Sequence, residues 1–404
     1  MKIHTASEVG FNPQGLTRIE AMLQRYVDEG RAAGMQALVA RHGRVACFTS
    51  AGFQNIKSKT PITDDTIFRI FSMTKPITSI ALMSLLEQGK CHLDDAAARW
   101  IPALDSLKVY TQEGAYEDLS APITIRQLLT HTAGFSYGFD PDNCAVDALY
   151  ANLWKASSTQ KNLTDLLDEI FELPLIAQPG TRWQYSVATD VCARLVELMS
   201  DMPFGDYLRE TIFDPLAMHD TAFEVPREKR HRLATLYGWT QDDPLAELEI
   251  ARRSVFIPPV PEERAVLQSG GAGLLSTSAD YLRFAQMVLN GGTLDGARIV
   301  SRKTVEWMIR NHVPQNMLPL AFNGIVPEQN SAYGFGLGFC VNTDAARAGT
   351  LGSTGDFGWG GLADTYCWVD PKESLIGILM QQYVPSLWHP GRRDFRNAVY
   401  QSLL

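Results

Sequence analysis

A serine and a lysine three positions apart, Ser72 and Lys75, open a strongly apolar segment that runs to Gln88. Residues with this spacing lie on one face of a helix, so the hydroxyl and the amine would be neighbours. A lysine can take a proton from a serine only if its pKa falls below the ordinary value of about 10.4, which burial can cause. The helix start would also direct free N–H groups toward an oxyanion formed at Ser72. The pattern therefore predicts nucleophilic catalysis by Ser72.

The Ser-x-x-Lys pattern alone is weak, because a second copy begins at Ser158 and ends at Lys161. That copy lies in a polar stretch with no hydrophobic helix behind it, so the context favours Ser72. Pro76 disfavours helical geometry for the residue before it and removes an N–H. We therefore expect the first turn after Ser72 to be tight or slightly irregular.

The elements expected to position this pair come from both ends of the chain. Asn12-Pro13 predicts the start of a first helix, and runs at 36–41 and 44–50 predict two strands joined by a tight hairpin at His42-Gly43. Residues 91–264 read as short helices, for example at 123–130, 163–171 and 189–199, and Asp190 is expected to cap a helix. A helix at 278–289 and three β-like runs at 333–341, 359–369 and 374–382 follow. Strands from both chain ends predict one sheet with helices inserted between them.

The amino-acid composition argues against several classes of function. The 404 residues are 45% hydrophobic, enough for a substantial core, and the net charge of -9 argues against a nucleic-acid partner. The N-terminus shows no secretory signal and no segment approaches the length of a membrane span, so we expect a cytoplasmic protein without a membrane partner. The six cysteines are widely spread, which favours reduced thiols over a zinc site, and we expect neither metal nor cofactor. The sequence leaves the oligomeric state open.

Five segments in a fixed order resemble the penicillin-recognising serine hydrolases and, within them, the bacterial family VIII carboxylesterases, which are relatives of class C β-lactamases. They are Ser72-Met73-Thr74-Lys75, residues 128–134, Tyr185-Ser186-Val187, residues 270–277 and Trp359-Gly360-Gly361. The resemblance runs nearly end to end. It implies a mixed α and β (α+β) fold of the β-lactamase/transpeptidase type: an antiparallel sheet flanked by helices from 1–90 and 265–404, a mainly helical domain at 91–264, and the active site in the cleft between them.

The same resemblance implies roles for individual residues. Tyr185 becomes the partner of Lys75 in activating Ser72, and the backbone N–H groups of Ser72 and Leu362 become the oxyanion hole. Residues 359–361 stand where the lactamases have Lys-Thr-Gly, and Val187 stands where they have Asn, so a neutral ester fits better than an anionic β-lactam. Trp359, Gly360 and Gly361 are expected to line the substrate site, and Tyr137 its wall.

The function implied is hydrolysis of small, short-chain carboxylic esters through a Ser72 acyl-enzyme. A β-lactamase, D-peptidase or acyltransferase could use the same residues, and a non-catalytic sensor could keep the fold, although it would be expected to lose the nucleophile or its bases. A Ser-His-Asp triad through His131 is disfavoured, because that residue lies in a stretch that the family uses structurally. The chain also lacks Gly-x-Ser-x-Gly, which argues against an α/β-hydrolase.

Overall fold

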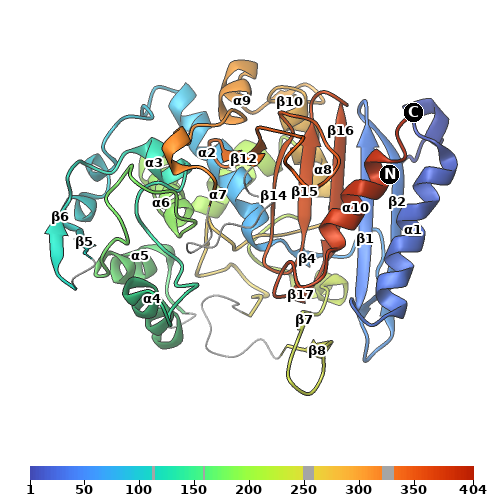
Figure 1. Cartoon of the computed structure of the whole chain (residues 1–404), viewed down its shortest axis with the longest axis horizontal. Helices are drawn as coiled ribbons and strands as arrows, with labels where there is room; N and C mark the ends of the chain where they lie inside the picture. Colours follow the sequence, from blue (N-terminus) through green and yellow to red (C-terminus); the bar gives the residue numbers. More distant parts are fainter. Residues whose placement is uncertain (112–113, 158–159, 249–258, 321–331) are drawn as a thin grey trace.

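A large antiparallel sheet forms one side of the molecule (Figure 1). The computed structural model describes residues 1–111, 114–157, 160–248, 259–320 and 332–404. The strand order is β12 (Tyr333–Phe335), β13 (Cys340–Asn342), β14 (Phe357–Gly360), β15 (Tyr366–Asp370), β16 (Leu375–Gln381), β1 (Gly34–Arg41), β2 (Arg44–Asn55) and β3 (Thr60–Pro61). The N-terminal strands pair directly with the C-terminal ones through β1 and β16. The prediction of one sheet built from both chain ends is therefore confirmed.

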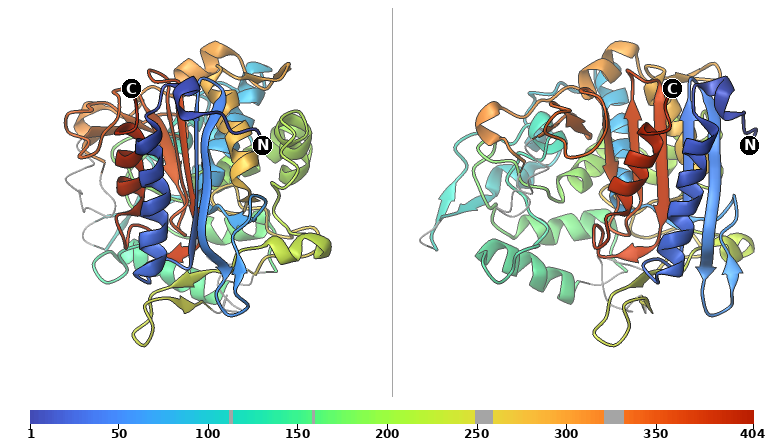
Figure 2. Two further views of the ribbon diagram at one scale, coloured as in Figure 1. Left: turned by 90° about the vertical axis from the view of Figure 1, so that its right-hand side faces the viewer. Right: turned by 45° about the vertical axis from the view of Figure 1, so that its right-hand side comes forward.

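Helices cover both faces of this sheet, because its central strands are apolar on both sides. Along β1, Met35, Ala37 and Val39 pack against one face, whereas Leu38 and Ala40 belong to the core of the other. The helices α1 (Pro13–Asp28) and α10 (Gly391–Tyr400) lie side by side on the first face, and α8 (Ser278–Leu289) packs on the second (Figure 2). The first helix starts as predicted, since the Asn12 side chain caps it by accepting from the N–H of Gln14.

The other half of the molecule is mainly helical. It holds α3 (Ile125–Leu129), α4 (Ala145–Ala156), α5 (Leu163–Phe171), α6 (Ala188–Ser200) and α7 (Phe204–Leu208), and α9 (Arg302–Met308) follows α8. The helix α2 (Thr74–Glu87) is buried almost all round and packs against α6 at the centre of the molecule (Figure 1). The predicted helices at 123–130, 163–171, 189–199 and 278–289 all exist, with ends shifted by at most two residues. The division into two domains stays a prediction.

Two of the three β-like runs predicted near the C-terminus are wrong in detail, because each is a hairpin instead of one strand. The run at 333–341 is split into β12 and β13 around Gly338, whose φ of +92° favours glycine. The run at 359–369 is split into β14 and β15, and Asp364 turns the chain with a φ of +63°. Both turns contain apolar residues, Leu337 and Phe339 in the first and Leu362 and Ala363 in the second, and these hid the reversals from the hydrophobic pattern.

Short two- and three-stranded ribbons complete the fold. They are β4 (Phe68–Arg69) with β9 (Leu275–Ser276), β5 (Lys108–Tyr110) with β6 (Tyr116–Asp118), β7 (Tyr237–Gly238) with β8 (Ala246–Glu247) and β17 (Tyr383–Val384), and β10 (Thr293–Leu294) with β11 (Ala297–Arg298). Among the described helices, none is both long enough and apolar enough to cross a bilayer.

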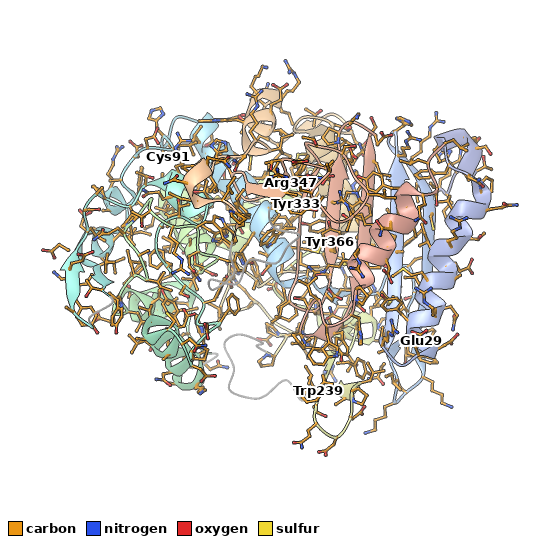
Figure 3. The ribbon with its side chains drawn as sticks, viewed as in Figure 1. Glu29, Cys91, Trp239, Tyr333, Arg347 and Tyr366 are labelled. Atoms are coloured by element: carbon orange, nitrogen blue, oxygen red, sulfur yellow. The ribbon has the colours of Figure 1, made fainter. Side chains whose placement is uncertain are left out.

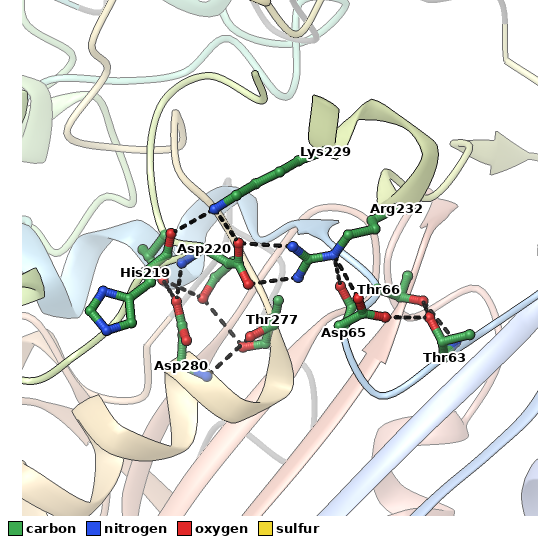
Figure 4. A network of polar contacts seen from close by, with 11 residues as sticks. Thr63, Asp65, Thr66, His219, Asp220, Lys229, Arg232, Thr277 and Asp280 are labelled. Carbon is green, nitrogen blue, oxygen red and sulfur yellow. Dashed lines mark hydrogen bonds and ion pairs between the residues drawn. The ribbon is translucent and has the colours of Figure 1, made fainter. Parts of the chain in front are cut away.

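A polar network clamps the start of α8 to the segment that precedes β4 (Figure 4). Asp280, in the first turn of α8, accepts from the backbone N–H of Asp220 at 2.7 Å. The Asp220 carboxylate pairs with Lys229 at 2.7 Å and with Arg232 at 2.6 Å, and Arg232 also reaches Asp65 at 2.9 Å. Charge-assisted contacts between sequence-distant segments thus tie the β4–β9 ribbon, which leads into the site, to the body of the protein.

Candidate active site

Ser72 lies where the β4 strand turns into the central helix. The strand ends next to β9, since the Ile70 N–H donates to the Leu274 carbonyl at 3.1 Å. A short 3₁₀ turn, Phe71–Met73, then leads into α2, so the predicted tight first turn is confirmed. Phe71 has a φ of +42°, a strained value for a residue with a large side chain, and such strain is characteristic of functional turns.

Lys75 lies directly behind Ser72 and is almost completely buried. Its Nζ is 3.2 Å from Ser72 Oγ, 2.9 Å from the Tyr137 hydroxyl and 2.7 Å from the Gly271 carbonyl oxygen. Burial lowers the pKa of Lys75 to about 7, while the nearby Asp190 carboxylate raises it. Near neutral pH the amine therefore exists in substantial amounts with its lone pair available. The carbonyl of Gly271 can only accept, so that lone pair is left to face Ser72 or Tyr137.

Tyr185 reaches the same serine from the loop that precedes α6. Its hydroxyl is hydrogen-bonded to Ser72 and accepts from Trp359 Nε1 at 3.2 Å. The Lys75 Nζ lies 4.6 Å from the centre of its ring. Burial raises the pKa of Tyr185, and the hydrogen bonds from Ser72 and Trp359 oppose this only in part. A buried phenol of this kind is suited to donate and relay a proton, whereas a resting phenolate is disfavoured.

The predicted catalytic groups thus meet where the first turns of α2 and α6 come together. The prediction that Asp190 caps a helix is wrong, because Asp190 lies within the first turn of α6, the cap position is Val187, and no side chain caps this helix. The Asp190 Oδ1 accepts from Ser269 Oγ at 2.6 Å and from the Gly271 N–H at 3.0 Å. Asp190 therefore holds the loop whose carbonyl binds Lys75. A side chain at Gly271 would collide with Asp190 Oδ2 and the Tyr137 hydroxyl, at 2.4 and 2.7 Å, which explains the glycine.

The segment Trp359-Gly360-Gly361 brings the end of strand β14 against the chain just before Ser72. A methyl group added at Gly361 would lie 2.4 Å from the Ile70 carbonyl oxygen, so only glycine permits this approach. Within the described residues, neither the Ser72 N–H nor the Leu362 N–H donates a hydrogen bond to the protein. Two uncommitted donors beside a nucleophile are the requirement for an oxyanion hole.

These residues open onto a cavity of about 760 Å³. Ser72, Tyr137, Tyr185, Trp359, Gly360, Gly361 and Leu362 all line it, whereas Lys75 does not. Phe139, Trp154, Leu166, Ile170 and Leu320 make one side apolar. The opposite side follows the sheet, where Tyr333 and Tyr366 lie close together (Figure 3). A mostly apolar cavity with a few converging polar groups is typical of a small-molecule site.

His131, the alternative base, is not placed for catalysis. His131 is buried, its Nδ1 lies 3.3 Å from Ser186 Oγ, and burial lowers its pKa well below the ordinary value. Its ring packs against that of Tyr185, with centroids 4.9 Å apart, which agrees with a structural role. Ser158 lies outside the described residues, while Lys161 forms an ion pair with Glu169. Within the part of the chain that the structure describes, no cluster of His, Cys, Asp and Glu could hold a metal ion.

Sequence reasoning missed two contributors to this site. Tyr137 was expected only in the pocket wall, yet its hydroxyl contacts Lys75. Arg392, on α10, was not singled out, although its guanidinium lies beside the Gly360-Gly361 backbone. The expectation that this place lacks positive charge is therefore incomplete. The charge comes from another element and is paired with Asp364, since the Arg392 Nε lies 2.6 Å from its Oδ1.

Comparison with known proteins agrees with this geometry. The model of the Beta-lactamase family matches residues 19–401. The chain belongs to this family. It is 33% identical to the protein Rv1367c of Mycobacterium tuberculosis, over 91% of this chain and 90% of that protein. It is 28% identical to the esterase EstB of Burkholderia gladioli, over 95% of this chain and 94% of that protein. Among solved structures, EstCE1, described as a hydrolase with promiscuous acyltransferase activity, superposes with a TM-score of 0.80. Its sequence is 27% identical, and the match covers 96% of this chain and 99% of that chain. This member of the family is therefore a serine hydrolase of the β-lactamase fold, similar to esterases.

Proposed function

We propose that the protein is a serine carboxylesterase of the family VIII type, which hydrolyses small, short-chain carboxylic esters through an acyl-enzyme on Ser72. The contact that carries the proposal is the one between Lys75 Nζ and Ser72 Oγ, at 3.2 Å, in a site that lowers the pKa of the lysine to about 7. A base with this pKa is matched to proton transfer near neutral pH.

The reaction begins when the neutral amine of Lys75 takes the proton from Ser72 Oγ, which attacks the ester carbonyl carbon. The negative charge that develops on the carbonyl oxygen is held by the N–H groups of Ser72 and Leu362. Tyr185 then passes a proton to the departing alkoxide as the C–O bond breaks, and Lys75 restores the tyrosine proton. Water, activated by the same pair, attacks the acyl-enzyme and releases the acid.

A neutral ester is supported over an anionic β-lactam by the groups around the cavity. Val187 offers no side-chain amide, and Trp359-Gly360-Gly361 offer neither ammonium nor hydroxyl to a substrate carboxylate. The Arg392 guanidinium is close, but Asp364 neutralises it, so its attraction for a second carboxylate is weak. The similarity to EstB is consistent with this preference.

Two measurements test the proposal. A fluorophosphonate should label Ser72, located by intact mass and peptide mapping, and Ser72→Ala should abolish the label; a label on Ser158 or on no serine would overturn the mechanism. Turnover of p-nitrophenyl butyrate should exceed that of nitrocefin by a wide margin. Robust lactam hydrolysis with negligible ester hydrolysis would instead identify a β-lactamase.

Acyl transfer is a second candidate, because the EstCE1 structure is described as that of a hydrolase with promiscuous acyltransferase activity. An acceptor alcohol would take the place of water in the second half of the reaction. Incubation with p-nitrophenyl butyrate and a primary alcohol would separate the two outcomes. Butyrate as the dominant product supports the esterase, and a butyrate ester of the added alcohol as the dominant product supports the transferase.

A further inference from the structure

We propose that Arg392, on the C-terminal helix α10, is a positioning residue that orients the Gly361–Leu362 peptide so that its N–H can hold the oxyanion formed at Ser72. The inference rests on the proposed function, since it concerns the transition state of attack by that serine. It adds a residue that lies 320 positions from the nucleophile in the sequence.

Two hydrogen bonds hold the carbonyl group of the Gly361–Leu362 peptide. The Arg392 Nη2 donates to the Gly361 carbonyl oxygen at 2.6 Å, and the Asp364 N–H donates to the same oxygen at 3.0 Å. In a trans peptide the C=O and the following N–H point in opposite directions. Because the carbonyl is held toward α10, the Leu362 N–H is turned away from α10. Ser72 and Leu362 line the same cavity, which Arg392 also borders, and we infer that the N–H turned away from the guanidinium faces the part of the cavity next to Ser72.

Arg392 is itself held in one place. Its Nε lies 2.6 Å from Asp364 Oδ1, and the two side chains are only 15% and 2% exposed. The Asp364 carboxylate is anchored in turn by Gln381 Nε2 at 2.5 Å. A methyl group added at Gly360 would lie 2.2 Å from Arg392 Nη1, so the missing side chain is what admits the guanidinium. Gly360 and Arg392 therefore form a matched pair, and the glycine has a role besides lining the substrate site.

The expected effect lies in the transition state. A charge-assisted hydrogen bond to a carbonyl is stronger than a neutral one, and it polarises the N–H at the other end of the peptide. Loss of one oxyanion donor typically lowers kcat by about 10²–10³. Arg392→Gln removes the positive charge and the paired N–H donors that hold the Gly361 carbonyl, so we expect kcat to fall at least about tenfold and KM to change little. Arg392→Lys should retain more activity.

The test compares Arg392→Gln and Arg392→Lys with Arg25→Gln. Arg25, on α1, is half-exposed and pairs with Asp394 of the same helix α10 at 3.7 Å, so its removal costs α10 one charge contact without touching Gly361. The readouts are kcat and KM for p-nitrophenyl butyrate, thermal stability, and the inhibition constant of a trifluoromethyl ketone analogue, which forms an oxyanion adduct with the serine.

We expect the inhibitor to bind Arg392→Gln more weakly than the wild type, in proportion to the loss of kcat/KM. The inhibitor affinity of Arg392→Lys should lie between these two, and that of Arg25→Gln should be close to the wild type. The proposal is overturned if inhibitor affinity in Arg392→Gln matches the wild type, or if Arg25→Gln loses as much. Failure of the proposed function is recognised separately, because the wild-type enzyme itself would then neither turn over the ester nor form the adduct.

Discussion

The pH dependence of acylation is the most direct test of Lys75 as the base. With a pKa of about 7, half of the molecules hold the neutral amine at pH 7, and only about one in eleven does so at pH 6. The active form is the deprotonated one, so kcat/KM should rise about tenfold per pH unit below 6 and level off above pH 8. A lysine with an ordinary pKa of about 10.4 would still be gaining activity at pH 9.

Asp190→Asn moves this profile in a direction that the structure specifies. The Asp190 carboxylate raises the pKa of Lys75 by favouring its ammonium form, against the larger effect of burial. The amide keeps an oxygen that can accept from Ser269 and Gly271, so the loop should stay in place. Removal of the charge should therefore lower the pKa of Lys75 and shift the acid limb to lower pH, while the plateau above pH 8 changes less.

The assay is initial-rate hydrolysis of p-nitrophenyl butyrate from pH 5 to 9, followed at the isosbestic wavelength of nitrophenol. Lys75→Arg is the control, because a guanidinium stays protonated throughout this range and should leave almost no activity at any pH. The reasoning is refuted if the wild-type limb lies above pH 9, if Asp190→Asn moves it to higher pH, or if Lys75→Arg keeps a comparable profile.

Three further predictions concern other parts of the site and the core. Tyr185→Phe should lower kcat about 10²–10⁴-fold with little change in KM, measured with the same ester, because the proton relay is lost while the ring stays packed; a rate near the wild type would exclude Tyr185 from the chemistry. Gly361→Ala should lower kcat about 10²–10³-fold by pushing the Leu362 N–H away from the nucleophile, and its phosphonylation rate should fall in parallel. Asp356→Ala should lower the free energy of unfolding by about 3–5 kcal/mol in urea titrations, because it leaves the buried Arg396 guanidinium, which lies 2.5 Å from the carboxylate, without its counter-charge. A loss below about 1 kcal/mol would show that the pair contributes no more than a surface ion pair.

The local sequence pattern alone was sufficient to predict the secondary structure next to the nucleophile. The spacing of Ser72 and Lys75, the apolar run behind them and Pro76 predicted a buried helix with an irregular first turn, and the structure has that helix. These inferences depend on residues within a few turns of one another, where helical periodicity fixes the relative positions. The resemblance then added Tyr185 and Leu362, which no local pattern connects to Ser72.

The partners of these groups were decided by the tertiary structure. Asp190 was expected only to cap a helix, and the sequence contains nothing that links it to the Gly271 loop 81 residues away. Arg392 is one of three arginines in α10, which packs on the core through side chains such as Phe395 and Val399, and nothing in the local pattern distinguishes it from the other two. Both residues act through hydrogen bonds between segments far apart in the chain, and periodicity carries no information about such contacts. The sequence therefore identified the nucleophile and its base, whereas Asp190 and Arg392, which hold the surrounding backbone in position, are brought to the site only by the tertiary fold.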